Sequence, residues 1–178
     1  MLSKKRIEEA EKNIKIYLDD GLLKKITQAQ TKDNIAQKIF MKNAKDSLKA
    51  AKLLLENEIP LWTIVASYYS MFYMANAVLI NLGYKTGDKI VHKVTADTLI
   101  AIVKNKLTKQ IIENYEEVAE EALNIAEIKS TEIIETFDYE RRKRSHIQYQ
   151  TTITDITTKA KTSLQRAQEF LFEMEGLL

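Results

Sequence analysis

The amino-acid sequence predicts an all-α protein, an up-and-down helical bundle with an N-terminal helical arm. Its 178 residues include only 4 glycines and 1 proline, too few turn residues for an all-β protein of this length. Apolar residues recur at intervals of three and four, and no segment shows the alternation of a half-buried strand. A chain of this length can bury a core of its own, so we expect one bundle domain.

The arm is predicted from apolar residues that recur at helical spacing and stop at Gly21. These residues are Ile7, Ala10, Ile14 and Leu18. The residues after Gly21 show no such series and indicate a connection. We therefore assign residues 1–34 to the helical arm and its linker, and residues 35–178 to the bundle. Because the apolar face of the arm needs a surface to cover it, a role of the arm in assembly is a further interpretation.

The bundle begins with an apolar series that predicts a long helix up to about Glu56. This series consists of Ile35, Ile39, Leu48, Ala51 and Leu55. Pro60 suits the first turn of the next helix, and Gly83 is a natural stop for it. Between them the sequence is apolar on most helical faces, which is typical of a helix in the centre of a bundle. Further helices are predicted over residues 91–102 and 111–125, from Ser130 to Phe137, and over residues 153–174.

Composition excludes several classes of protein. There are no cysteines, which excludes a disulfide scaffold and a thiolate metal site, and the two histidines are far apart in the sequence. We therefore expect no metal and no other cofactor. Lysine and arginine total 27 against 25 acidic residues, so any basic function must be local. No apolar run approaches the roughly 18 residues of a membrane span, and we expect a cytoplasmic protein that makes no membrane contact.

One segment concentrates residues that could act on an anionic substrate: FDYERRKRSHIQYQ, residues 137–150. If this segment is helical, Arg142, His146 and Tyr149 lie on one face, with Arg141 and Arg144 flanking it. Guanidinium groups match phosphate oxygens, an imidazole exchanges protons near neutral pH, and a tyrosine ring stacks on a base. Such residues can bind and cleave an RNA phosphodiester without a metal, with the RNA's own 2′-hydroxyl as the nucleophile.

The same features also have simpler interpretations. The basic segment fits a surface helix whose arginines pair with Glu132, Glu135 or Glu140. His92 follows a glycine-containing loop at the predicted start of a helix, where a local structural role is expected. Asn76 lies inside the apolar helix and is expected to pair with a polar group on a neighbouring helix or at an interface. Core packing is expected for the aromatic residues of that helix, which are Trp62, Tyr68, Tyr69, Phe72 and Tyr73.

Several short motifs follow one another between residues 44 and 99. They are Tyr68-Tyr69-Ser70-Met71-Phe72 with Ala75, then Gly83-Tyr84, then His92. In this order they resemble the front half of the HEPN family of small helical proteins, and residues 140–178 resemble the last helices of that family. The resemblance covers roughly residues 35–178 and implies a helical bundle.

The resemblance also implies a function. HEPN proteins are often homodimers, and active members are metal-independent ribonucleases in which each subunit contributes an Arg-x4–6-His motif to a shared cleft. Many act as toxins beside a small nucleotidyltransferase antitoxin. Arg141 and His146 fit the motif and become the candidate catalytic residues, with Arg142, Arg144 and Tyr149 as candidate RNA- or phosphate-binding residues. In one branch of the family an arginine stands five residues before a tyrosine, and Arg144 with Tyr149 fits that form, which would make His146 incidental.

The sequence therefore favours a HEPN-like metal-independent ribonuclease or RNA-binding toxin that acts as a homodimer on RNA. The alternative is a non-catalytic HEPN interaction module that binds a nucleotidyltransferase partner or a nucleotide. Whether the chain is an endoribonuclease or no enzyme at all stays open at this level.

Overall fold

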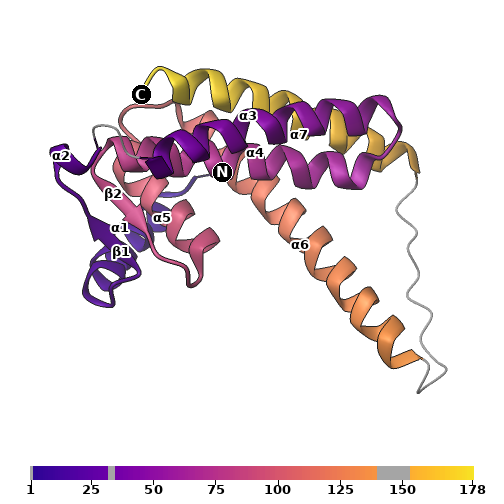
Figure 1. The fold of residues 1–178 in the computed structure, drawn as a ribbon, viewed down its shortest axis with the longest axis horizontal. Helices are drawn as coiled ribbons and strands as arrows, with labels where there is room; N and C mark the ends of the chain where they lie inside the picture. The colour runs from indigo at the N-terminus through magenta and orange to yellow at the C-terminus, as the bar shows by residue number, and fades with distance from the viewer. Residues whose placement is uncertain (1, 32–34, 140–152) are drawn as a thin grey trace.

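A computed structural model of the protein describes residues 2–31, 35–139 and 153–178, and its fold is all-α, as predicted (Figure 1). The elements in chain order are α1 (Lys4–Asp19), β1 (Leu23–Lys25), α2 (Gln28–Thr31), α3 (Ile35–Glu56), α4 (Pro60–Asn81), β2 (Tyr84–Thr86), α5 (Val91–Val103), α6 (Lys109–Tyr139) and α7 (Ile153–Glu175). In Figure 1 the long helices α3, α4 and α7 run side by side, and α1, α5 and the two short strands lie at one end of this layer.

Helix α4 is the centre of the bundle. It is buried along nearly its whole length because α3, α5, α6 and α7 all pack against it. The expectation that no apolar segment reaches the length of a membrane span is wrong for this helix, whose length and composition alone would suit one. However, 83% of its most apolar window is buried inside the protein. This arrangement is that of a core helix, and it confirms the central position predicted from its nearly uniform apolar surface.

The two ends of α4 are set by local chemistry that the sequence predicts. Pro60 occupies the first turn, where its missing N–H costs no helical hydrogen bond. Gly83 has a φ of 87°, a left-handed conformation that glycine adopts without strain. A Cβ atom at Gly83 would also lie 3.3 Å from the carbonyl oxygen of Ile26, so this turn closely approaches the residue after β1.

Strands β1 and β2 form a small antiparallel ribbon that the sequence does not predict. Leu23 is opposite Thr86 and Lys25 is opposite Tyr84. Strands of three residues are too short to show an alternating pattern, and their pairing joins segments far apart in the chain. The ribbon attaches the end of the arm to the turn that follows α4.

Helix α6 is longer than predicted. A new helix was expected to begin at Ser130, but α6 continues through this residue to Tyr139, so that prediction is wrong. No glycine or proline interrupts the sequence there, and a serine inside a helix is tolerated at small cost. In Figure 1 the second half of α6 extends away from the layer of α3, α4 and α7.

Some apolar residues that define predicted helices are not covered. The long helix predicted up to about Glu56 is confirmed as α3. Two of the apolar residues that predicted it are nevertheless exposed, Ile35 at 74% and Ile39.

Trp62 was expected in the core, but it is 49% exposed. Its neighbours Thr63 and Ile64 at the start of α4 are fully buried, so Trp62 lies on the solvent-facing side of the helix there. Tyr68 and Phe72, about two and three turns further along, are buried as predicted.

A buried carboxylate fixes the N-terminal arm to the bundle. The side chain of Asp97 on α5 is 1% exposed, and its Oδ1 lies 2.7 Å from Nη1 of Arg6 on α1. Its Oδ2 accepts hydrogen bonds from the Tyr17 hydroxyl at 2.7 Å and from the Asn13 amide at 2.9 Å. Arg6 also donates from Nε to Glu116 on α6 at 2.8 Å. The arm is therefore held to α5 and α6 by paired charges, as well as by packing.

We expect Arg6→Met to lower the free energy of unfolding by about 3 kcal/mol, because the buried Asp97 carboxylate would lose its counter-ion. Methionine keeps much of the apolar volume of the arginine stem, so the loss is mainly electrostatic. Urea denaturation measures the change. Lys4→Met is the matched control, since Lys4 and Glu8 form an exposed pair 3.9 Å apart that should contribute little. Equal effects of the two substitutions would contradict the prediction.

Candidate functional site

The predicted site residues Arg141, Arg142, Arg144, His146 and Tyr149 lie outside the residues that the structure describes. Their roles stay predictions. What the structure describes is the pair of helices on either side of them: α6 ends at Tyr139 and α7 begins at Ile153.

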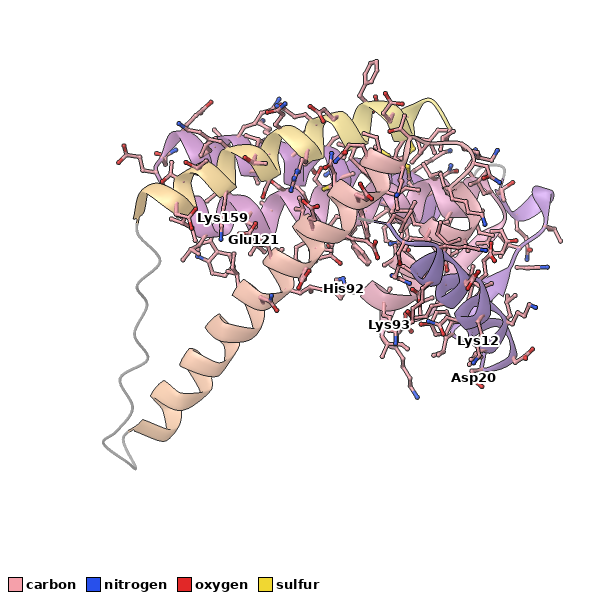
Figure 2. All side chains as sticks on the ribbon, turned by 180° about the vertical axis from the view of Figure 1, so that it is seen from behind. Lys12, Asp20, His92, Lys93, Glu121 and Lys159 are labelled. Atoms are coloured by element: carbon pink, nitrogen blue, oxygen red, sulfur yellow. The ribbon has the colours of Figure 1, made fainter. Side chains whose placement is uncertain are left out.

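The flanking helices are joined by ion pairs well before α6 ends. Lys159 on α7 lies 3.5 Å from Glu121 on α6, near the point where α6 leaves the bundle (Figure 2). One level further into the bundle, Arg166 lies 2.8 Å from Glu117. The basic stretch therefore connects two helices whose bundle ends are fixed relative to each other.

The other histidine, His92, lies in the first turn of α5 and is half-buried (Figure 2). Its Nδ1 lies 2.7 Å from the hydroxyl oxygen of Tyr68 on α4. The imidazole ring also packs on Phe72, with ring centroids 4.6 Å apart, and meets Tyr69 edge-on. The expected local structural role of His92 agrees with these contacts, and the buried hydroxyl of Tyr68 has the partner that it needs.

Burial shifts the proton equilibria of this pair. It lowers the pKa of His92, because a partly dehydrated imidazolium loses solvation, and raises the pKa of Tyr68, because a buried phenolate does too. Both side chains are therefore neutral at neutral pH, and one hydrogen bond joins them. Burial likewise raises the pKa of Tyr115 on α6, whose ring centroid lies 6.1 Å from that of Tyr68. The pair is suited to hold α5 against α4, and poorly suited to pick up a proton.

A layer of aromatic rings extends from this pair across the bundle. Phe40 on α3 stacks on Tyr73 of α4 at 6.1 Å, and Tyr73 contacts Tyr69 at 5.8 Å. On the other side, Tyr115 stacks on Phe170 of α7 at 5.4 Å. Contacts of this kind contribute beyond the area they bury, so the aromatic layer joins α3, α4, α6 and α7.

A hollow of about 330 Å³ lies beside the aromatic layer, between α3, α4 and the turn from β2 to α5. Asn76 stands at this hollow and is fixed in place. Its amide nitrogen donates to the Phe72 carbonyl at 2.9 Å and to the Thr95 hydroxyl at 3.2 Å, and its oxygen accepts from the Thr86 hydroxyl at 2.9 Å. The expectation that Asn76 pairs with a neighbouring helix is confirmed, since Thr95 belongs to α5. The hollow is lined by Ala36, Phe40, Phe72, Asn76, Ile80, Lys85, Thr86, Gly87, Asp88 and Val91.

Sequence reasoning did not find this hollow, because its walls come from segments that are separated along the chain. The signal that was visible is the polar Asn76 inside an apolar helix. Among the residues that the structure describes, no three histidine, aspartate or glutamate side chains come together as a metal site would require.

The stability of the fold should fall on acidification because of His92. Its pKa in the folded protein lies below the ordinary value of 6.5, so the unfolded chain takes up a proton at a higher pH than the folded chain does. The resulting loss begins as the pH falls through about 6.5 and levels off below the folded-state pKa. Urea denaturation between pH 5 and pH 8 should show this loss in the parent protein and a smaller one in His92→Gln. Identical pH dependences would contradict it.

Comparison with known proteins gives one match. A family model described as the HEPN domain matches residues 37–177, most of the chain from α3 through α7. No curated protein and no solved structure matches the chain. The matched span contains the central helix, the His92–Tyr68 pair, every residue that lines the hollow except Ala36, and the basic stretch between α6 and α7. The chain belongs to the HEPN domain family.

Proposed function

We propose that this protein is a metal-independent endoribonuclease that acts as a cytoplasmic homodimer. The observation that carries the proposal is that the family match extends across residues 140–152, where the chain has Arg141 and His146 at the spacing of the HEPN ribonuclease motif. Family membership is consistent with action on RNA or nucleotides in general. A toxin role beside a nucleotidyltransferase antitoxin is part of the same proposal.

The chemistry assigned to the basic stretch is transesterification within the RNA. The 2′-hydroxyl oxygen bonds to phosphorus while the bond from phosphorus to the 5′-oxygen breaks, which leaves a cyclic phosphate and a 5′-hydroxyl. One imidazole accepts the proton of the 2′-hydroxyl, and the imidazole of the second subunit donates a proton to the leaving oxygen. Arg141 and Arg144 hold the phosphate and stabilise the negative charge that develops on it. Arg142 and Tyr149 help to hold the RNA strand.

The environment of His92 supports the choice of His146 as the acid–base residue. The Nδ1 atom of His92 is engaged with Tyr68 at 2.7 Å, and burial lowers the pKa of the imidazole. A histidine that is held neutral and hydrogen-bonded in a bundle wall is a poor proton donor near pH 7. Since the chain has only 2 histidines, imidazole catalysis falls to His146.

We expect His146→Ala to reduce RNA cleavage by roughly 100- to 10,000-fold, the range of positioned acid–base catalysis. The measurement is single-turnover cleavage of a labelled RNA in the presence of a metal chelator. His92→Gln is the matched control, and it should keep cleavage at neutral pH because His92 has no role in the proton transfers. If the parent protein cuts no RNA, or if His146→Ala cuts as fast as the parent, the proposal fails.

The same assay decides between two assignments of the motif. In the first register the motif is Arg141 with His146, and in the second register it is Arg144 with Tyr149. We expect Arg141→Ala to lower the cleavage rate more than Tyr149→Phe does, because the first register makes Arg141 and His146 the catalytic pair. Circular dichroism and the oligomer mass control for folding and assembly. A rate that depends on Arg144 and Tyr149, and remains unchanged in His146→Ala, would instead assign the site to the second register.

The exposed apolar surface favours a second candidate function. Ile35, Ile39 and Ile90 are exposed, and each is next in sequence to a residue that lines the hollow. Exposed apolar residues that gather on a surface often mark contact surfaces. In this alternative the protein is a non-catalytic module that binds a nucleotidyltransferase or a nucleotide. It predicts a stable complex with such a partner and no cleavage by the purified protein, even at high concentration.

A further inference from the structure

We propose that the hollow between α3, α4 and the β2–α5 turn binds a single guanine base of the RNA. This inference rests on the proposed action on RNA and adds to it a recognition subsite, distinct from the basic stretch, that sets a base preference. The site is built from Phe40, Phe72, Lys85, Asp88 and Val91, with Asn76 and Thr86 as its support.

The walls of the hollow suit a flat ring. Phe40 and Phe72 line it with aromatic surface, and Val91 adds aliphatic surface. Phe40 is partly exposed and is itself supported by its stack on Tyr73. The partly exposed ring of Phe40 can stack on a base, and every base has a ring face for such a contact. Phe72 is buried and adds apolar surface to the wall. The volume of about 330 Å³ is at the small end of the range for ligand pockets, which fits one base with its sugar at the opening.

The polar groups of the hollow select among the bases. Asp88 and Lys85 are both exposed residues that line the hollow, and neither side chain forms an ion pair with another described residue. A carboxylate only accepts hydrogen bonds, and an ammonium only donates them. Guanine has two adjacent donors, N1–H and N2–H, which fit both oxygens of one carboxylate. It also has O6 and N7 as acceptors for the lysine.

The other bases fit this pair of groups less well. Adenine and cytosine each have an exocyclic amino group next to a ring nitrogen that only accepts hydrogen bonds. One oxygen of the Asp88 carboxylate could accept from the amino group, but the other oxygen would face the lone pair of the ring nitrogen. Uracil offers a single N–H between two carbonyl oxygens. An acceptor-only carboxylate therefore distinguishes guanine from the other three bases, while the phenylalanine rings do not.

The segment that carries Lys85 in β2 and Asp88 in the following turn is held in place from two sides. The Gly87 amide donates to the Leu22 carbonyl at 2.8 Å, beside the β1–β2 ribbon. A Cβ atom at Gly87 would lie 3.3 Å from that carbonyl oxygen, so the two segments are in close contact there. On the other side, Thr86 donates to the buried Asn76 at 2.9 Å. A turn fixed in this way loses little conformational freedom when a ligand binds, which favours affinity.

The experiment is a calorimetric titration of the whole 178-residue chain with each of four nucleotides, the monophosphates of guanosine, adenosine, cytidine and uridine. We expect guanosine monophosphate to bind roughly 5- to 100-fold more tightly than the other three, as one bidentate base contact provides. Asp88→Asn should abolish that preference and should bind xanthosine monophosphate better than the parent does, because the amide nitrogen can donate to the C2 carbonyl of xanthine. A gain of xanthine binding cannot come from a misfolded variant.

Two further variants act as controls. Phe40→Ala should weaken all four nucleotides by a similar factor, since stacking does not depend on base identity. Asp46→Asn removes an exposed carboxylate of α3 that pairs with Lys42 and does not line the hollow, and it should change nothing. Equal affinity for all four nucleotides, absence of binding, or a guanine preference that survives Asp88→Asn would each overturn the inference.

The test also separates this inference from the proposed function. The His146→Ala protein should keep the guanine preference, because the subsite lies on α3, α4 and the β2–α5 turn. Guanine selectivity in a protein that cuts no RNA would leave the subsite standing and reject the ribonuclease. Cleavage with no base preference and no nucleotide binding would do the reverse.

Discussion

The structure depends on the need to cover α4 on all sides. This helix has almost no polar face, so a single neighbour cannot bury it, and four helices from separate parts of the chain surround it. Two of its buried polar side chains have partners on other elements: Ser70 donates to the Ala44 carbonyl of α3 at 2.9 Å, and Asn76 donates to the Thr95 hydroxyl of α5 at 3.2 Å. Helix α6 leaves the layer of helices before it ends, and α7 returns along α4. In the sequence the basic stretch is the segment between these two helices.

A second constraint extends the fold beyond the matched family domain. The buried Asp97 carboxylate needs a counter-ion, and no cation within α5 supplies it, so Arg6 of the arm does. Apolar residues agree with this: Ala10 of α1 belongs to the same core cluster as Leu99 of α5. The β1–β2 ribbon then links the end of the arm to the turn at the hollow. Through these contacts the arm indirectly supports the position of Asp88.

Local chemistry explains which features were predictable from the sequence. Pro60 and Gly83 mark helix ends through their own backbone preferences, and the apolar spacing of α3, α5 and α7 is visible within each segment. Features that depend on distant partners were not predictable. The choice of Arg6 among many cations as the partner of Asp97, the exposure of Trp62, and the meeting of Phe40 with Asp88 at one hollow all arise from packing. The five predicted site residues follow from spacing and family resemblance, and they remain predictions.

The two candidate sites, the hollow and the basic stretch, differ in the chemical groups that they contain, and this difference assigns them different roles. The hollow has a fixed frame, aromatic walls and two charged side chains, Lys85 and Asp88, that form no ion pair with another described residue, but no imidazole lines it. His92 packs against Phe72, is engaged with Tyr68 and does not line the hollow. The basic stretch has the opposite composition, with an imidazole among guanidiniums and one tyrosine. A protein that both selects and cuts RNA would therefore use the rigid hollow to position a base and the connection between α6 and α7 to act on the phosphate.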